Sequence, residues 1–218
     1  MPEPYTLAVL SGGIAGLLVR FLKRGFHEVK RTVDFTAAVI LLIILAPITG
    51  LAALLVKLTS AGPAFFTQVR VGQDGSLFNM IKLRTMYANA ENNTGPIWAK
   101  KRDPRVTPLG YFLRMTHLDE VPQLINVIKG EMSLIGPRPE RPYFVNQFRR
   151  SIPRYESRLA IRPGITGLAQ VRHKYDESIE DVKKKLGYDL AYVENMNWLT
   201  DVKIAFLTIG MIAGKNAR

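Results

Sequence analysis

Two adjacent carboxylates, Asp119 and Glu120, are the first candidates for chemistry in this sequence of 218 residues. They stand just before Pro122, and proline is tolerated in the first turn of a helix, so the pair is predicted at the start of a helix running through Leu124 and Ile128. The free N–H groups at a helix start favour carboxylates and also bind phosphate. Taken alone, such a pair usually does no more than complement the helix dipole.

The surroundings of the pair point to a phosphate substrate. Arg138 stands between Pro137 and Pro139, and the two prolines stiffen its backbone, so its guanidinium can be aimed with little loss of entropy. An aimed guanidinium suits bidentate contacts with phosphate. The cations that could contact such a substrate are Lys82, Arg84, Arg114, Arg138 and Arg162. A carboxylate pair among these cations suggests a site for a multiply charged phosphate compound.

The composition restricts the partners. The net charge is +12 and the isoelectric point is near 10.0, so anionic lipid head groups, phosphorylated substrates and nucleic acid all fit the field of the protein. Nucleic-acid binding would also favour exposed aromatic residues interleaved with basic ones, and no such patch is seen, so no nucleic-acid partner is predicted. The absence of cysteine excludes disulfides and thiolate metal sites, and the three scattered histidines predict no zinc site.

A long apolar run over residues 35–56, FTAAVILLIILAPITGLAALLV, predicts a membrane segment. It carries no charge and is long enough to cross a hydrocarbon core of about 30 Å as a helix. It starts too far into the chain for a signal peptide, and no small-residue cleavage site follows. Pro47 near its middle should kink or break the helix. The pattern leaves two alternatives, a kinked spanning helix and a re-entrant helix-break-helix.

The remaining segments predict a mostly helical α/β (α+β) fold. Residues 63–86 predict an antiparallel β-hairpin that turns at Asp74-Gly75. Residues 88–101 predict a polar loop, and the apolar stretch 199–214 is expected to pack on the domain or to lie in the head-group region. No glycine-rich phosphate loop or dinucleotide fingerprint occurs, and no doubly wound sheet is predicted. The expected parts are an interfacial segment 1–29, a membrane anchor 30–58 and a domain 59–218.

Seven short motifs, in this order, resemble the bacterial sugar transferases, also called monotopic phosphoglycosyl transferases. The resemblance covers about residues 30–209. The motifs are Lys30-Arg31 with Asp34, Lys82–Met86, Asp103–Thr107, Leu118–Leu124, Gly136–Pro139, Arg162–Gly167, and Tyr188-Asp189 with Tyr192. Each motif alone is weak evidence, whereas all seven in one order are highly specific.

The resemblance implies a two-step reaction with Mg²⁺, which Asp119 would contact. Asp119 would attack the β-phosphorus of a nucleotide diphosphate-sugar, expected to be a UDP-sugar, and form a covalent phosphosugar that undecaprenyl phosphate or another polyprenol phosphate then receives. Glu120 would position groups or deprotonate the incoming lipid phosphate. Arg114 and Arg138 would hold phosphates, and Arg162 the nucleotide side.

The resemblance also favours the re-entrant anchor, with the catalytic domain on the cytosolic face of the bacterial inner membrane. The reaction would be the first membrane step in making a lipopolysaccharide or an exopolysaccharide. The expected partners are a nucleotide-sugar, polyprenol phosphate and membrane lipids, and a homo-oligomer is left open. Two positions depart from the family pattern, because Ala46 and His117 stand where the family commonly has serine.

Two other functions fit part of the sequence. A non-enzymatic basic module that binds anionic membranes would explain the charge and the apolar run, but not the carboxylate pair among arginines. A phosphatase for lipid diphosphates would have the same charge requirements, with hydrolysis as the outcome.

Overall fold

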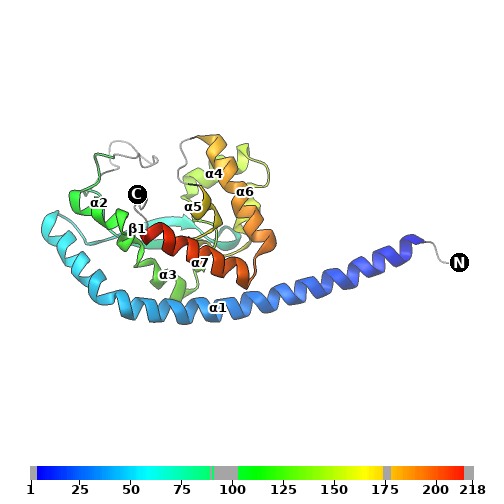
Figure 1. Ribbon diagram of the computed structural model, residues 1–218. Coiled ribbons are helices and arrows are strands. Elements are labelled where there is room, and N and C mark those ends of the chain that lie inside the picture. Colours follow the sequence, from blue (N-terminus) through cyan, green and yellow to red (C-terminus); the bar gives the residue numbers. More distant parts are fainter. Residues whose placement is uncertain (1–3, 89, 91–102, 174–177, 214–218) are drawn as a thin grey trace.

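The computed structural model describes residues 4–88, 90, 103–173 and 178–213, and it shows one long helix with a compact body packed along it (Figure 1). The long helix is α1 (Pro4–Thr59). Most of the polar segment predicted at 88–101 lies outside the described residues. The body is mostly helical and carries one small antiparallel hairpin, as the sequence predicted.

Helix α1 continues through Pro47 without a break. Its last turns, cyan in Figure 1, curve upward around the body, and Pro47 lies inside the helix rather than at its end. Proline leaves one carbonyl of the preceding turn without its N–H partner. The hydroxyl of Thr49 does not take up that role, because it is buried and has no hydrogen-bond partner in the part of the chain that the structure describes. This one helix contains the described residues of the predicted segment 1–29, from Pro4 onward, and the whole of the predicted segment 30–58.

The second half of α1 is apolar and largely uncovered. Gly25–Thr59 is long and apolar enough to cross a membrane, by length and composition. One narrow side of it is buried against the body, through Ala38, Ala52 and Val56. Large apolar side chains on its other sides are exposed: Ile40, Leu41, Ile43, Ile44, Ile48, Leu51, Leu54, Leu55 and Leu58. An uncovered apolar surface of this size is typical of a segment that lies in lipid.

The predicted hairpin is confirmed. Strand β1 (Phe65–Val71) pairs antiparallel with β2 (Leu77–Leu83), and the 3₁₀ turn η1 (Gln73–Gly75) connects them. Asp74 has φ 53° and Gly75 has φ 81°. Aspartate and glycine tolerate this left-handed region better than other residues, which is why Asp-Gly marks the turn.

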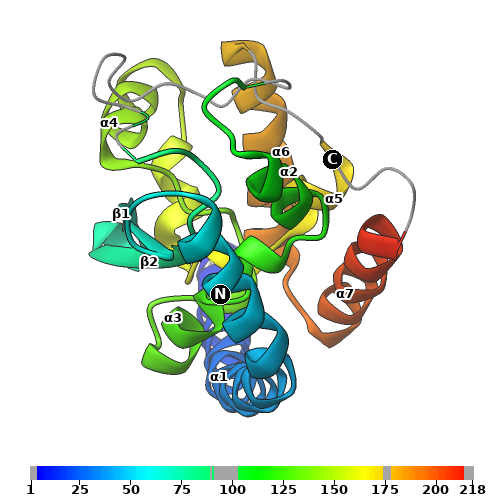
Figure 2. The same ribbon diagram turned by 90° about the vertical axis from the view of Figure 1, so that its left-hand side faces the viewer.

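The rest of the body follows in short elements. They are α2 (Pro108–Met115), η2 (Leu118–Glu120), α3 (Gln123–Lys129), β3 (Ser133–Ile135), α4 (Pro142–Ser151), η3 (Tyr155–Ala160), β4 (Gly164–Thr166), α5 (Leu168–Arg172), α6 (Ile179–Asn195) and α7 (Trp198–Ala213). Figure 2 looks nearly along α1 and shows α3 and α7 on either side of it. Helix α7 is the apolar stretch near the chain end, and it packs on the body through Ile204 while Leu199 and Phe206 stay exposed.

A short parallel pairing of β3 with β4 joins two of the motifs into one backbone unit. The Gly164 N–H donates to the carbonyl of Pro137 at 2.9 Å, and the Gly136 N–H donates to the carbonyl of Thr166 at 2.9 Å. A Cβ on Gly164 would lie 2.1 Å from the Gly136 nitrogen, and a Cβ on Gly136 would lie 2.5 Å from the carbonyl oxygen of Arg162. Both positions require glycine because the two backbones touch.

A buried polar cluster, called here the anchor cluster, fastens α1 to the body. It consists of Lys30 and Asp34 on α1, Ser133 on β3, Tyr192 on α6 and Asp201 on α7. Lys30 Nζ lies 2.7 Å from Asp201 Oδ2 and 3.5 Å from Asp34 Oδ1. The Ser133 hydroxyl donates to Asp34 at 2.6 Å, and the Tyr192 hydroxyl donates to Asp201 at 2.6 Å. Each carboxylate in this cluster therefore has two partners.

Candidate active site

Asp119 and Glu120 lie in the 3₁₀ turn η2, which precedes α3. The sequence placed them in the first turn of the α3 helix, and this detail was wrong. Pro122 has no N–H to donate, so the α-helical ladder cannot extend upstream through it. The turn closes instead with a bond from the Glu120 N–H to the carbonyl of His117, which itself has φ 56°.

Glu120 is held on both sides by cations. Arg138 Nη2 lies 2.5 Å from Glu120 Oε1, and Arg138 Nη1 lies 3.4 Å from Oε2, which makes a two-pronged contact. Lys82 Nζ donates to Oε1 at 3.1 Å. Burial alone would raise the pKa of Glu120, but the charges and hydrogen bonds of Arg138 and Lys82 outweigh burial and hold that pKa far below its usual range. Glu120 is thus a permanently ionised, fixed group.

Asp119, unlike Glu120, is not paired with a neighbouring cation in the part of the chain that the structure describes. Its side chain is buried, with 7% of the residue exposed, yet within the described residues its carboxylate makes no hydrogen bond or ion pair. Burial and the neighbouring charge of Glu120 raise the pKa of Asp119, although Lys82, Arg114 and Arg138 oppose the rise. A buried carboxylate that is near three cations and bonded to none of them is available to react with a ligand.

Arg114 and Arg138 are both oriented by neighbours. The Arg114 Nε donates to the hydroxyl of Thr85 at 2.8 Å, and burial lowers the pKa of Arg114. The backbone of Arg138 is held by Arg158, whose Nη2 donates to the Arg138 carbonyl at 2.8 Å. Arg158 is itself fixed by an ion pair of 2.8 Å with Asp189, in which both side chains are 2% exposed.

Two predicted substrate contacts are engaged elsewhere. Arg84 donates to the carbonyls of Ser60 and Ala61, which fastens the end of α1 to the hairpin. The Arg162 Nε donates to the carbonyl of Gly130 at 3.0 Å, at the far end of α3. The structure therefore brings Lys82, Arg114 and Arg138 to the carboxylate pair, and it uses Arg84 and Arg162 at backbone carbonyls.

Sequence reasoning missed Arg70, Thr85 and Arg158 as supports of the site. Arg70 on β1 donates to the carbonyl of Pro139 at 3.0 Å, and burial lowers its pKa to about 10. Its position opposite Phe78 in the hairpin could have suggested a side chain on the same face as Lys82. Arg158 has one local partner, the hydroxyl of Tyr155, but the partners that tie it to the site, Arg138 and Asp189, lie 20 and 31 residues away along the chain.

The donor set agrees with the Mg²⁺ implied by the family. Among the described residues, no three histidine, aspartate or glutamate side chains gather as a preformed metal site. Magnesium is commonly held by only one or two carboxylates, with waters and substrate phosphates completing its shell. The carboxylate of Asp119, which has no partner among the described residues, would fit such a site.

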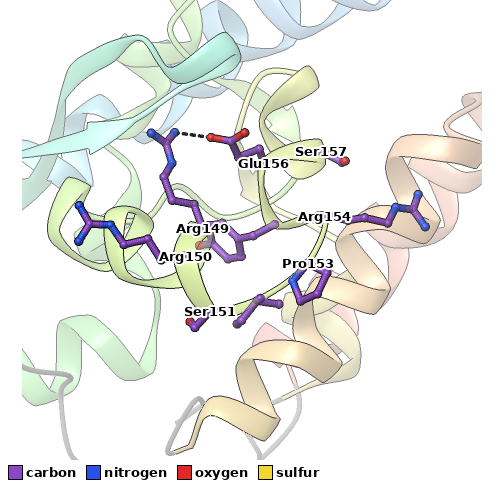
Figure 3. Close-up of a pocket in the computed structure, with 9 residues that line it drawn as sticks. Arg149, Arg150, Ser151, Pro153, Arg154, Glu156 and Ser157 are labelled. Atoms are coloured by element: carbon purple, nitrogen blue, oxygen red, sulfur yellow. Dashed lines mark ion pairs between the residues drawn. The ribbon is translucent and has the colours of Figure 1, made fainter.

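A surface hollow of about 370 Å³ lies elsewhere, between α4 and η3. Figure 3 shows that the arginines that line it, Arg149, Arg150 and Arg154, point in different directions. Arg149 is paired with Glu156 at 3.0 Å, and Arg154 with Glu194 at 2.7 Å. Because the guanidiniums diverge, the hollow does not form a phosphate site, and the carboxylate pair remains the candidate centre.

Comparison with known proteins agrees with the motifs. The family model described as bacterial sugar transferase matches residues 26–215. A UDP-N-acetylgalactosamine-undecaprenyl-phosphate N-acetylgalactosaminephosphotransferase of Aeromonas hydrophila is 45% identical over 184 residues, which are 84% of this chain and 43% of that protein. A UDP-glucose:undecaprenyl-phosphate glucose-1-phosphate transferase of Caulobacter vibrioides is 41% identical over 182 residues, 83% of this chain and 68% of that protein.

A shorter relative matches over almost its whole length. An exopolysaccharide production protein of Rhizobium leguminosarum bv. phaseoli is 37% identical over 185 residues, 83% of this chain and 92% of that protein. The chain thus spans less than half of the Aeromonas relative and nearly all of the Rhizobium one. The family model covers most of the chain and includes the whole carboxylate site, and the chain belongs to the bacterial sugar transferase family.

Proposed function

We propose that this protein transfers a sugar-1-phosphate from a nucleotide diphosphate-sugar to undecaprenyl phosphate, through a covalent intermediate on Asp119. The observation that carries the proposal is the contrast within the pair: Glu120 is bonded to two cations, whereas Asp119 is buried beside the same cations and makes no bond with any described residue. The UDP-sugar and undecaprenyl-phosphate substrates named for the relatives support the choice of donor and acceptor.

In the first step, a carboxylate oxygen of Asp119 forms a bond to the β-phosphorus of the donor. The bond from that phosphorus to the bridging oxygen breaks, and nucleoside monophosphate leaves with the electron pair. In the second step, a phosphate oxygen of the polyprenol phosphate attacks the same phosphorus, and the carboxylate of Asp119 is released. Covalent catalysis divides one difficult transfer between anions into two easier ones. The raised pKa of Asp119 makes its ionised form a stronger nucleophile.

The attacking carboxylate of Asp119 and the diphosphate of the donor are both anions, so nearby cations are needed to reduce their repulsion. Lys82, Arg114 and Arg138 act electrostatically on Asp119 and can stabilise charge that develops on the transferred phosphate. Mg²⁺ held by Asp119 would add Lewis-acid polarisation of the phosphate oxygens. The clamp from Arg158 onto the Arg138 carbonyl limits movement of the segment that carries Arg138, which favours a fixed binding geometry.

The contacts of Glu120 favour one of its two predicted roles. A general base should have a pKa near the working pH. The pKa of Glu120 is held far below that range, and its oxygens already accept from Lys82 and Arg138. Glu120 therefore serves to position these two cations, and the incoming lipid phosphate must lose any proton to another group or to water.

The anchor is proposed to be re-entrant, with both flanks of α1 on the cytosolic side. The bend of α1 beyond Pro47 and its exposed apolar side chains support this topology. A cysteine introduced near residue 5 of this cysteine-free chain should resist a membrane-impermeant thiol reagent applied outside spheroplasts. Replacing Pro47 with alanine should straighten the helix, so that the introduced cysteine becomes accessible to the reagent in part of the molecules. Labelling of the chain that retains Pro47 would show a true span and refute the proposal.

The reaction is tested with the purified full chain, undecaprenyl phosphate, Mg²⁺ and a panel of nucleotide-sugars. One donor should release nucleoside monophosphate and yield a polyprenol diphosphate-sugar, and mass spectrometry without acceptor should detect a phosphosugar on the peptide containing Asp119. Hydrolysis of lipid diphosphates without transfer would identify a phosphatase instead. No turnover of any donor, with membrane binding intact, would favour the non-enzymatic module.

A further inference from the structure

The carboxyl end of α3, opposite the end next to Asp119, gathers two guanidinium groups from distant parts of the chain. Arg31 on α1 donates from Nη1 to the carbonyl of Val127 at 2.6 Å and from Nη2 to that of Ile128 at 2.8 Å. The Arg162 Nε donates to the carbonyl of Gly130 at 3.0 Å. A Cβ on Gly130 would lie only 3.4 Å from Arg31 Nη2, so both arginines meet at this glycine.

Capping the helix explains only part of this arrangement. Free carbonyls at a helix end favour a nearby cation. Here two guanidiniums repel each other at one helix end, and the exposed Lys129 stands in the same last turn. The acid that attracts Arg31, Asp34, is already bonded to Ser133 and paired with Lys30. Within the described residues, the two terminal nitrogens of Arg162 make no hydrogen bond.

The pair lies where the polar part of α1 meets its apolar part. The uncharged run begins at Phe35, one helical turn after Arg31. The Arg31 guanidinium lies over the Phe35 ring, 5.7 Å from its centroid, and Phe35 is 43% exposed. Side chains just before an apolar membrane segment lie at the level of the lipid head groups. The guanidinium groups could contact a lipid phosphate here, and the exposed ring of Phe35 could contact the hydrocarbon.

We propose that Arg31 and Arg162, with Lys129 beside them, bind the phosphodiester head group of an anionic phospholipid. Guanidinium groups suit phosphate oxygens, and a phosphate would relieve the repulsion between the two arginines. Basic pockets on the cytosolic side of membrane proteins are known binders of anionic head groups. The exposed ring of Phe35 would contact the start of the acyl chains. The seven residues of α3 separate this site from Asp119, so it differs from the place where the acceptor reacts.

The test compares lipid binding to the full chain in mild detergent by native mass spectrometry. Phosphatidylglycerol and phosphatidylcholine are titrated against the parent protein, Arg162→Gln and Arg150→Gln. The control removes the same charge from exposed Arg150 in the hollow of Figure 3. Arg162→Gln should weaken phosphatidylglycerol binding about fivefold, the effect of one cation near a membrane surface. Arg150→Gln should leave it unchanged, and phosphatidylcholine should bind weakly to all three.

Three outcomes would overturn the proposal. The first is an equal loss of phosphatidylglycerol binding in Arg162→Gln and Arg150→Gln, and the second is no loss in either variant. The third is displacement of the lipid by millimolar inorganic phosphate, which would identify a site for the free ion. If Arg162→Gln fails to fold, Arg162→Lys keeps the charge but loses the fork, and a smaller loss is still expected. The readout is lipid binding, so a negative result would leave the proposed transferase reaction unaffected. A negative result in the transferase assay would likewise leave the proposed lipid site unaffected.

Discussion

The anchor cluster and the candidate active site both place two carboxylates next to cationic side chains, and they differ in how these groups are paired. The anchor cluster is buried and has one cation, Lys30, whereas in the candidate active site Asp119 is buried and Glu120 is partly buried. In the anchor cluster, Asp34 and Asp201 each have two partners. In the active site, Glu120 has two partners and Asp119 has none among the described residues.

The difference shows what distinguishes a structural ion cluster from a reactive one. A buried charge with all its partners stabilises one arrangement of the chain, whereas removal of a single partner is strongly destabilising. A buried charge without a partner disfavours the native state and persists where function requires it. Both clusters place carboxylates beside cations, so we attribute the proposed reactivity of Asp119 to its lack of a bonded partner among the described residues.

The largest expected effect is the loss of turnover in Asp119→Asn. An amide cannot act as the nucleophile, so both transfer steps should fall by at least about a thousandfold. Folding should persist, because the substitution removes a buried carboxylate whose pKa is raised. Nucleoside monophosphate release and thermal unfolding measure the two properties, with Asp74→Asn in the exposed hairpin turn as control. Substantial activity in the variant would remove Asp119 from its proposed role.

For Asp201→Asn in the anchor cluster, we expect stability to fall while the activity of the folded protein is kept. Loss of the negative charge leaves Lys30 with the more distant Asp34, so the free energy of unfolding should fall by about 3 kcal/mol. The fraction that remains folded should keep its activity. Urea titration in detergent, followed by assay of the folded fraction, checks this. An unchanged stability would mean that the cluster does not fasten α1 to the body.

A smaller effect is expected when Arg138 is replaced by lysine. The charge is kept, but the two-pronged contact with Glu120 and the bidentate reach to phosphate are lost. We expect a loss of about tenfold or more in kcat/KM, corresponding to about 1.4 kcal/mol of transition-state binding. Arg150→Lys, at an exposed position, is the matched control. Equal activity of the Arg138→Lys variant and the parent would exclude the phosphate-clamp role.

The smallest effect concerns pH. Asp119 must be ionised to attack, and its pKa is raised above the ordinary value of 3.8, so the rate of the first step should fall as pH drops through a value above 3.8. Glu120 stays ionised throughout, because its pKa is lowered. Lys82 lowers the pKa of Asp119, and Lys82→Met should therefore move the acid limb to higher pH. A limb that stays in place in this variant would contradict the proposed coupling.

The stability of the protein should follow the same two groups with opposite signs. Asp119, with a raised pKa, contributes stability that is present below its unfolded pKa and is lost as pH rises through its folded pKa. Glu120, with a lowered pKa, contributes stability that is present above its unfolded pKa and is lost as pH falls. The free energy of unfolding of Asp119→Asn, measured with urea across the acid range, should therefore lack the pH dependence due to Asp119 and keep that due to Glu120.

Local patterns in the sequence predicted the parts that depend on local physics. Asp74-Gly75 placed the hairpin turn, and the uncharged run placed the apolar half of α1. The carboxylate pair and Arg138 were predicted because prolines restrict the backbone near them, whereas Lys82 was predicted from its place at the end of a hairpin strand and Arg114 from its place just upstream of the pair. The pattern allowed either a kink or a break at Pro47, and the helix continues through this residue, since one lost hydrogen bond does not interrupt a helix that packs along the body.

The parts that depend on contacts distant in sequence could not be predicted. The parallel pairing of β3 with β4 involves three residues on each strand, too few for a periodic signal, and it joins Gly136 to Gly164. Arg84 and Arg162 looked like substrate contacts because arginine near a rigid turn suits phosphate and backbone carbonyls equally. Only the three-dimensional arrangement decides which acceptor is near.

The ion pair between Lys30 and Asp201 joins residues that are 171 positions apart, and this separation has a consequence for biosynthesis. At about 5–20 residues per second, a ribosome adds Asp201 roughly 10–35 s after Lys30. The apolar half of α1 is therefore made, and can enter the lipid, well before α7 exists to neutralise the lysine beside it. Until then the only ion pair of this cluster that can form is the longer one between Lys30 and Asp34. With the proposed membrane anchor, the apolar helix would reach the lipid first, and the body would close onto it as one of the last events of folding.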